Sequence, residues 1–498
     1  MEIQLATGTS ESFENAKNIY TKGAFSKSVA TMTLGTPLTS NVAKGTTVSG
    51  VNADGSDVVG KTLSDYSSGA NILEIQYQTL DVQANYVGCQ VGANPTPNTE
   101  GCFAASGTLT IEGEGSVSYT YNPLSNNGNG RTIQGFSTGA EEKMFRCENC
   151  PYSTYQKFYD YYGAFDYADK WAMAAFSGSR TSFSNGNANF GLYGFTGKAE
   201  AIKKGTTFMN IWMYVIREME DALDDCQEGC DFEQNCNDDP VHAWDEAVAF
   251  YTGSLEGKDG AGDGKLIHAL ADKRCANFRT CGDLANEDSG TSHINLEIFR
   301  EFSIGLNKLV QGECASARAQ VERIEQLMAV PMIQGTLRYA YITDFDDAGE
   351  KPEAEGAVFA ASVLPLVHAC NAEAAATIYN NMKVGQNGSA NFQQVKDAFE
   401  SVYSCMGIRS EYVGGLWDSA TGQYMKGAAP AGTSSGSDKN IGLIVGLTVG
   451  GFVFLVLVYV LSVKRGKKKA AQRQLDVESQ EQPSGQDPHT SVHDSEVM

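Results

Sequence analysis

The strongest constraint on this chain is an uncharged apolar segment near its C-terminus. Residues Ile441–Val463 have the sequence "IGLIVGLTVGGFVFLVLVYVLSV", without a charged side chain. About 20 such residues are enough to cross a bilayer as a helix. A basic run starts directly afterwards at Lys464, and basic flanks stay on the cytoplasmic side of a membrane. We therefore expect a single-pass plasma-membrane protein, with the residues before the span outside the cell and a cytoplasmic tail at 464–498.

The part of the chain before this span carries the net charge. The tail holds equal numbers of basic and acidic residues, so the formal charge of −23 falls on the rest. An acidic surface disfavours nucleic acid as a partner and favours cations or basic surfaces, although a need for solubility explains it equally well. The first residues include no apolar signal segment, so we expect that the native signal was removed or is missing from this sequence.

All 12 cysteines precede the span, which predicts disulfides formed in an oxidising compartment. The close pairs Cys89–Cys102 and Cys275–Cys281 fit local bridges. The alternative is a zinc site drawn from Cys147, Cys150, Cys226, Cys230 and Cys236. The sequon at Asn387 predicts glycosylation of an exposed position.

Hydrophobic spacing predicts an α+β fold. Leu73 and Ile75 alternate with polar residues, and Thr108–Tyr121 is typical of a hairpin that turns at Gly113–Gly115. After Cys150 the spacing becomes helical. The long helices are expected near 200–225, 294–328, 356–383 and 392–405. The expected domains are a β-rich N-terminal lobe at 1–140, helical modules forming a cleft at 141–425, a flexible stalk at 426–440, the membrane helix at 441–463 and the tail at 464–498.

A weak internal repeat suggests that the helical region consists of two related modules. The segment "YDYYGAF" at Tyr159–Phe165 matches "WDEAVAF" at Trp244–Phe250. "NANFG" at Asn187–Gly191 and "CANFR" at Cys275–Arg279 follow at similar distances, and a long amphipathic helix follows each. Two modules facing each other across a cleft are therefore expected.

The second module contains the first candidate site. On a helix, His242, Asp245 and Glu246 lie at i, i+3 and i+4, which puts them on one face and suits a metal ion. The alternative is the solvated face of a capped amphipathic helix. Its expected parts are Asp238 or Asp239 as N-cap, Pro240 in the first turn, and Trp244 and Phe250 in the core.

The first module and a later segment supply phenols and carboxylates. Tyr159 and Asp160 occupy the place that Trp244 and Asp245 hold in the second module. Phenolate and carboxylate oxygens are hard donors that suit Fe³⁺, although tyrosines at helical spacing are also common in cores. Arg338, near Tyr341, either holds an anion that completes a ferric shell or pairs with nearby acids. The predicted iron ligands are His242, Asp245, Glu246, Tyr159, Asp160 and Tyr341.

Other acidic spacings and the missing motifs limit the function. Glu218 with Glu220, and Glu322 with Glu325, are predicted to be surface ion-pairing faces. The sequence has no His-Glu-x-x-His, Gly-x-Ser-x-Gly or Walker A motif, and few histidines precede the span. We therefore expect a protein that is not an enzyme.

The block from His242 to Phe278, "HAWDEAVAFYTGSLEG…ALADKRCANF", preceded by "YDYYGAFDYADKW", resembles the low-iron-inducible surface and periplasmic protein family of algae and diatoms. With the membrane span, the chain is most similar to the diatom phytotransferrins. The resemblance covers roughly residues 10–410. It implies capture of ferric iron at the cell surface, carbonate as a synergistic anion, and uptake by endocytosis with release in acidified vesicles. The internalisation signal is not identified, because the tail lacks a Tyr-x-x-apolar motif.

Two other classes of function stay open. A disulfide-linked adhesion or receptor module needs no metal, and Gly442, Gly446 and Gly450 form a small-residue face that can dimerise the span. A surface redox enzyme is the second, and it would require a haem or flavin for which no motif is present. A partner reductase at the cell surface and the endocytic machinery are the further partners expected for an iron-uptake protein.

Overall fold

The computed structural model describes residues 1–22, 29–51, 57–76, 106–121, 132–229, 239–253, 266–346, 349–385 and 390–430. The described residues belong to one unit that spans Met1–Thr433. The predicted membrane span, the tail, the sequon and most of the stalk lie outside the described residues. Within the described ranges, no helix combines the length and apolarity needed to cross a bilayer.

Six antiparallel strands form one curled sheet with the order β3-β2-β5-β6-β1-β4. They are β1 (Val29–Leu34), β2 (Thr47–Val51), β3 (Asp57–Thr62), β4 (Ile72–Gln76), β5 (Ser106–Ile111) and β6 (Gly115–Tyr121). Leu63 pairs with Ile75, which brings the two ends of the sheet order together. The predicted hairpin is confirmed: β5 and β6 pair directly, and Gly113 and Gly115 take the positive φ that the turn requires. Leu73 and Ile75 are fully buried in the core of this sheet.

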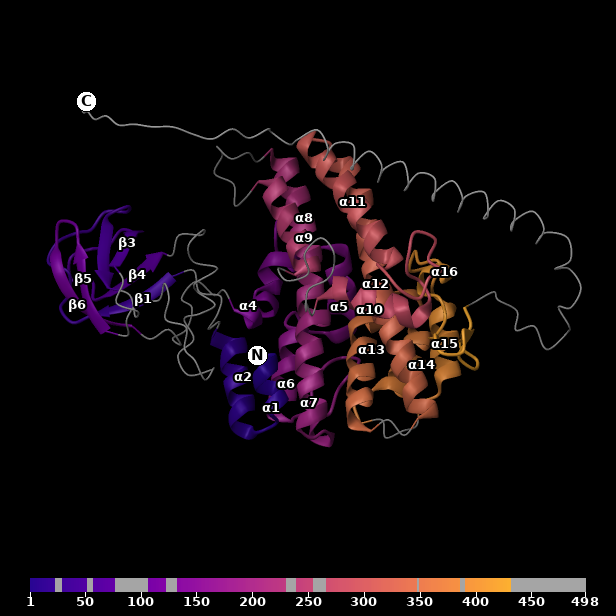
Figure 1. The fold of residues 1–498 in the computed structure, drawn as a ribbon. Helices are drawn as coiled ribbons and strands as arrows, with labels where there is room; N and C mark the ends of the chain where they lie inside the picture. Colours follow the sequence, from indigo (N-terminus) through magenta and orange to yellow (C-terminus); the bar gives the residue numbers. More distant parts are fainter. Residues whose placement is uncertain are drawn as a thin grey trace, which may run out of the picture. The chain divides into compact units, whose positions relative to one another are not determined.

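The remaining elements are mainly helices, so the predicted α+β class is confirmed (Figure 1). The first group is α1 (Glu2–Thr7), α2 (Ser10–Lys22), α4 (Ile133–Thr138), η1 (Glu141–Phe145), α5 (Ser153–Tyr162), α6 (Tyr167–Ser177), η2 (Phe190–Leu192), α7 (Phe195–Gly205), η3 (Thr206–Ile211) and α8 (Trp212–Glu228). The second group is α9 (Pro240–Thr252), α10 (Ile267–Phe278), α11 (His293–Val310), α12 (Cys314–Phe345), α13 (Glu350–Cys370), α14 (Ala372–Met382), α15 (Phe392–Glu400) and α16 (Ser410–Val413). A two-stranded ribbon, β7 (Trp417–Asp418) and β8 (Gln423–Tyr424), follows.

The N-terminus differs from the expected β-rich lobe at 1–140. Residues 2–22 are helical, and Leu5, Phe13 and Ala16 join the core of the helical region. The strands therefore lie in the sequence between two stretches that both belong to the helical region. Apolar residues recur in α2 at helical spacing, so one face of this helix is buried. The β-type composition of the segment that follows led to the prediction of strands for the whole N-terminal region.

The predicted amphipathic stripe near 200–225 is confirmed. Its apolar members, listed here, are all buried: Phe208, Ile211, Trp212, Val215, Met219 and Leu223. The helix is composite, because α7 continues through the π-helical η3 into α8. The single helix predicted near 294–328 is wrong, since α11 and α12 are separated at Gln311–Glu313, where Gly312 has φ +70°.

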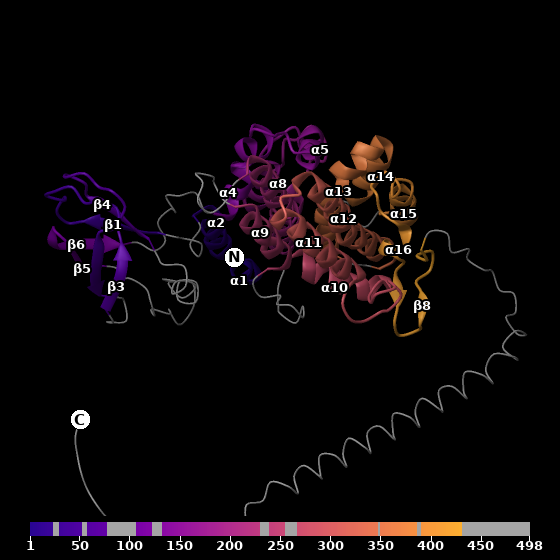
Figure 2. The ribbon, with the colours of Figure 1, turned by 90° about the horizontal axis from the view of Figure 1, so that it is seen from above.

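Helix α12 lies at the centre of the helical packing. It contacts α8, α10, α11, α13 and α15, and Figure 2 shows it between α11 and α13. Helices α8 and α9 pack against each other, and α9 also contacts α10 and α11. Cys226, near the end of α8, forms a disulfide with Cys314 at the start of α12. This disulfide holds the C-terminal end of α8 against the start of the central helix α12.

The disulfides of the structure decide between the two predictions for the cysteines, which were disulfide bridges or a zinc site. Cys275–Cys281 is confirmed, and Cys370–Cys405 is a further pair. The zinc alternative is wrong for its described members, because Cys147 pairs with Cys150 and Cys226 with Cys314. The remaining cysteines, Cys89, Cys102, Cys230 and Cys236, lie outside the described residues.

The sequence repeat does not extend to the helix boundaries. Helix α5 ends at Gly163, which has φ +67°, so Phe165 follows the helix. The matching Phe250 lies inside α9. Asn187–Gly191 leads into a short 3-10 turn, whereas Cys275–Arg279 closes α10. The two segments therefore share residues but not backbone conformation.

Candidate functional site

Helix α9 begins as one of the two sequence interpretations predicts. The Asp239 carboxylate caps it by accepting hydrogen bonds from the backbone N–H groups of Val241 (3.0 Å) and His242 (2.9 Å), and Pro240 occupies the first turn. Trp244 is 1 % exposed, and its indole N–H donates to the Phe302 carbonyl of α11 at 3.0 Å. This anchor fixes the rotation of α9.

The anchor depends on a glycine that leaves room for the indole. A Cβ added at Gly305 of α11 would lie 2.2 Å from Trp244 Cζ2. We expect Gly305→Val to lower the free energy of unfolding by at least about 2 kcal/mol, because the methyl groups cannot be accommodated without moving α9. Ser303→Val, on the exposed side of the same helix, is the matched control. Equal urea midpoints for the two variants of the full chain would contradict this close contact.

With α9 fixed in this way, His242 and Glu246 point outward together. Their side chains are 58 % and 45 % exposed, and His242 Nε2 lies 3.5 Å from Glu246 Oε1. Asp245 is also exposed. The expected shared face is therefore present for the i, i+4 pair, and its solvation leaves both side chains accessible to an ion.

The neighbouring face of α8 carries a carboxyl group that the sequence interpretation placed at the surface. Glu218 is 1 % exposed, and Glu220 is 4 % exposed and paired with Arg318 at 2.6 Å. The prediction of a solvated face at these two residues is therefore wrong. Burial is the main reason that the pKa of Glu218 rises to about 8; Glu246 and Asp221 raise it further, and Arg217 partly opposes them.

The second predicted surface pair is also partly enclosed. Glu322 is exposed, but the Glu325 carboxylate accepts a hydrogen bond from Thr154 Oγ1 at 2.8 Å. Burial and Glu220 raise the pKa of Glu325 to about 7. Glu325 therefore belongs to the contact between α5 and α12.

An arginine and a phenol complete the face of α8. The Arg217 guanidinium pairs with Glu218, and with Asp221 at 3.0 Å, while its buried Nε has no hydrogen-bond partner among the described residues. Tyr214 is 5 % exposed, and its hydroxyl accepts a hydrogen bond from Lys143 Nζ at 3.0 Å. We call Tyr214, Arg217, Glu218, Asp221, His242 and Glu246 the α8–α9 cluster.

The other predicted ligands have different neighbours. Tyr159 stacks on Phe165 with 4.4 Å between ring centroids, and Asp160 accepts a hydrogen bond from Gln156. Tyr341 packs against Phe345 and Phe392. The Arg338 guanidinium lies 5.1 Å from the centre of the Tyr339 ring. None of these contacts includes His242. They therefore do not bring the predicted ligands of the two modules together in one site.

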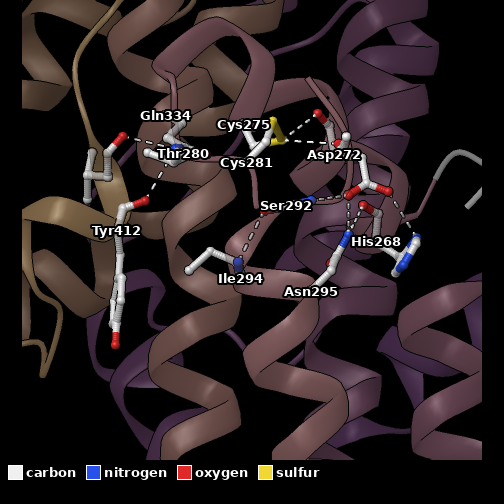
Figure 3. Close-up of a disulfide and its surroundings, with 12 residues drawn as sticks. His268, Asp272, Cys275, Thr280, Cys281, Ser292, Ile294, Asn295, Gln334 and Tyr412 are labelled. Carbon is white, nitrogen blue, oxygen red and sulfur yellow. Dashed lines mark hydrogen bonds and ion pairs between the residues drawn. A yellow bond between two sulfur atoms is a disulfide. The ribbon is translucent and has the colours of Figure 1, made fainter. Parts of the chain in front are cut away.

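The block that carries the family resemblance contains a buried polar network beside a disulfide (Figure 3). Asp272 Oδ1 accepts hydrogen bonds from the Ser292 backbone N–H and from Asn295 Nδ2, both at 2.7 Å. Asn295 also accepts from Tyr251 and donates to the His268 carbonyl at 3.0 Å. Burial lowers the pKa of His268, which lies 3.8 Å from Asp272. This network joins α9, α10 and α11 and holds the outward face of α9 in place.

No protein-family model, no curated protein and no solved structure matches the chain. The family resemblance therefore stays a prediction. Within the described part of the chain, no group of three or more His, Cys, Asp or Glu side chains is already arranged around a common metal position. An ion at the α8–α9 cluster would have to draw the carboxylates together.

The residues of α8 were not identified as candidates from the sequence, although their spacing was visible. Tyr214, Arg217, Glu218 and Asp221 lie at i, i+3, i+4 and i+7, which is one helix face. Beside a strong apolar stripe, such a face is usually solvated. Only the packing of α9 against it shows that it is covered.

Proposed function

We propose that this protein captures ferric iron outside the cell and that the α8–α9 cluster is the binding site. One observation carries the proposal: Glu218 is buried, and this burial, helped by Glu246 and Asp221, raises its pKa to about 8. The Glu218 carboxyl group lies within the electrostatic influence of Asp221, Glu246 and the Arg217 guanidinium. A trivalent cation would replace the Glu218 proton and draw these carboxylates together, and His242 stands next to Glu246 to bind it.

The donor types support iron over softer metals. Carboxylates and the Tyr214 phenol are hard oxygen donors, and imidazole also binds iron. Arg217 carries a buried N–H without a partner, which suits a small anion bound together with the metal, as carbonate is expected to be. The iron is the cargo of this site, and no catalytic step is part of the proposal.

The wider proposal places this site on the cell surface. It includes anchoring by Ile441–Val463, uptake by endocytosis and release in acidified vesicles. Acid release follows from the cluster, because Glu218 can bind iron only without its proton. Falling pH returns this proton and weakens binding.

The direct test is ferric titration of the purified full chain, with and without bicarbonate. We expect a visible phenolate-to-iron absorption band and tighter binding with bicarbonate. His242→Ala and Glu246→Gln should each weaken binding by roughly 10–100-fold. The exposed Glu322→Gln is the control and should bind normally. Arg217→Gln should bind iron with no gain from bicarbonate. Normal affinity of both His242→Ala and Glu246→Gln would show that the iron site lies elsewhere.

A further inference from the structure

A second polar cluster lies at the opposite end of the composite helix that carries Glu218. It gathers side chains from α7, α10, α12 and α13. We call these residues the basic cluster: Lys203, Lys204, Lys273, Arg274, Arg338 and Lys351, with Glu200, Glu355 and Tyr339 among them. Its cations outnumber its carboxylates, whereas the α8–α9 cluster has the opposite balance.

Lysines already occupy the carboxylates of this cluster. Lys204 bridges Glu200 and Glu355, the latter at 2.6 Å, and Lys203 lies 2.9 Å from Glu200. Lys351 approaches Glu200 at 3.8 Å. Glu355 is also hydrogen-bonded to the Tyr339 hydroxyl. The two acids are therefore committed to lysine and phenol partners.

Arg274 is a buried cation with two unused donors, although Tyr339 and Glu355 lie near enough to favour its charge. Arg274 is 2 % exposed, and its Nε and Nη1 have no hydrogen-bond partner within the described residues. The guanidinium lies 5.9 Å from the centre of the Tyr339 ring. Burial lowers the pKa of Arg274 to about 10; the nearby Arg338 adds to this shift, and Tyr339 and Glu355 partly oppose it. A buried charge with unused donors is costly unless an anion meets it.

The same helix face also offers an unused acceptor. Asn277 lies three residues after Arg274, so the two side chains are neighbours on α10. Asn277 Oδ1 is buried and has no hydrogen-bond partner among the described residues. A ligand that fits both side chains must accept from the guanidinium and donate to the amide oxygen. Phosphate does so near neutral pH, because it keeps an O–H group, whereas sulfate has none.

We infer that the basic cluster is a second site, separate from the iron site, that binds inorganic phosphate, with Arg274 donating to its oxygens and Asn277 accepting from its hydroxyl. Lys273 and Lys351 are exposed and give the approach a positive charge. The enclosure of Arg274 favours the free ion over a phosphate ester, because an ester needs room for its organic group. The iron-capture proposal assigns no ligand to Arg274 or Asn277.

Calorimetric titration and thermal unfolding of the phosphate-free full chain test this inference. Phosphate should bind and raise Tm, sulfate should bind at least about tenfold more weakly, and glycerol phosphate should not bind. Arg274→Gln should lose roughly 10–100-fold in phosphate affinity, which corresponds to the loss of charge-assisted hydrogen bonds. Arg300→Gln, at a 59 % exposed arginine, is the matched control and should bind normally.

Several outcomes would overturn the inference. They are no phosphate binding by the unaltered chain, unchanged binding by Arg274→Gln, or preferential binding of bicarbonate or sulfate. If Arg274→Gln does not fold, Lys273→Gln replaces it. Its phosphate affinity should fall about threefold, because the positive potential next to Arg274 is weaker. Both variants should keep normal ferric affinity, so a failure of this site can be distinguished from a failure of the iron site.

Discussion

Replacing Glu218 with glutamine is expected to stabilise the protein at pH 8 and to weaken its binding of ferric iron. The folded pKa of Glu218 is about 8, against an ordinary value of 4.5. The folded state therefore holds a proton that the unfolded state has lost, and stability falls as the pH rises from about 4.5 to about 8. A neutral amide removes this dependence, with a gain on the order of 2–4 kcal/mol at pH 8.

Urea unfolding of the full chain at pH 5, 6, 7 and 8 measures this effect. The variant should show a flatter profile than the unaltered chain, and the exposed Glu322→Gln should keep the original slope. For iron, the unaltered chain should lose up to about tenfold in affinity for each pH unit below 8 through this one group. The variant should bind more weakly at pH 8 and lose less on acidification. Parallel stability profiles would refute the assignment of a buried, protonated Glu218.

Removing the Cys226–Cys314 disulfide is expected to cost more stability than removing any short-range pair. It links residues 88 apart, so its loss frees a large loop in the unfolded chain. In the chain-entropy model this is worth about 4–5 kcal/mol, and measured losses for native disulfides are about 2–5 kcal/mol. The paired variant Cys226→Ser with Cys314→Ser should show this drop.

Cys147→Ser with Cys150→Ser is the comparison, because that pair is only three residues apart and should cost about 2 kcal/mol. Denaturant midpoints of both doubly substituted chains give the difference. Ferric affinity should also fall in the first variant, since Cys226 secures the helix that carries Glu218 and Asp221. Equal midpoints would show that the long link does not restrict the unfolded chain.

Sequence patterns predicted the elements whose signals are local. The β5–β6 hairpin followed from alternation and two glycines, and the cap at Asp239 followed from an acid before a proline. The break at Gly312 was missed, because apolar spacing continues across it. Whether an acidic face is solvated depends on a partner helix, so the burial of Glu218 and Glu220 could not be predicted from α8 alone.

The candidate site shows the same division. The pairing of His242 with Glu246 is a property of one helix, and spacing predicted it. The prediction that Tyr159, Tyr341 and His242 share one site depended on how distant helices pack. In the structure both tyrosine rings pack against other aromatic rings instead. The burial of Arg274 could not be predicted from α10 alone, because its neighbours Tyr339 and Glu355 belong to α12 and α13, which follow much later in the chain.

The π-helical segment η3 stands between the residues of the two clusters on a single axis. Lys204 precedes it and Glu218 follows it, about 21 Å apart along the helix. A π turn holds about one residue more than an α turn, and each residue corresponds to about 100° of rotation. The number of residues in η3 therefore sets the angle about the helix axis between Lys204 and Glu218, and so between the lysine-bearing side and the carboxylate-bearing side of one continuous helix.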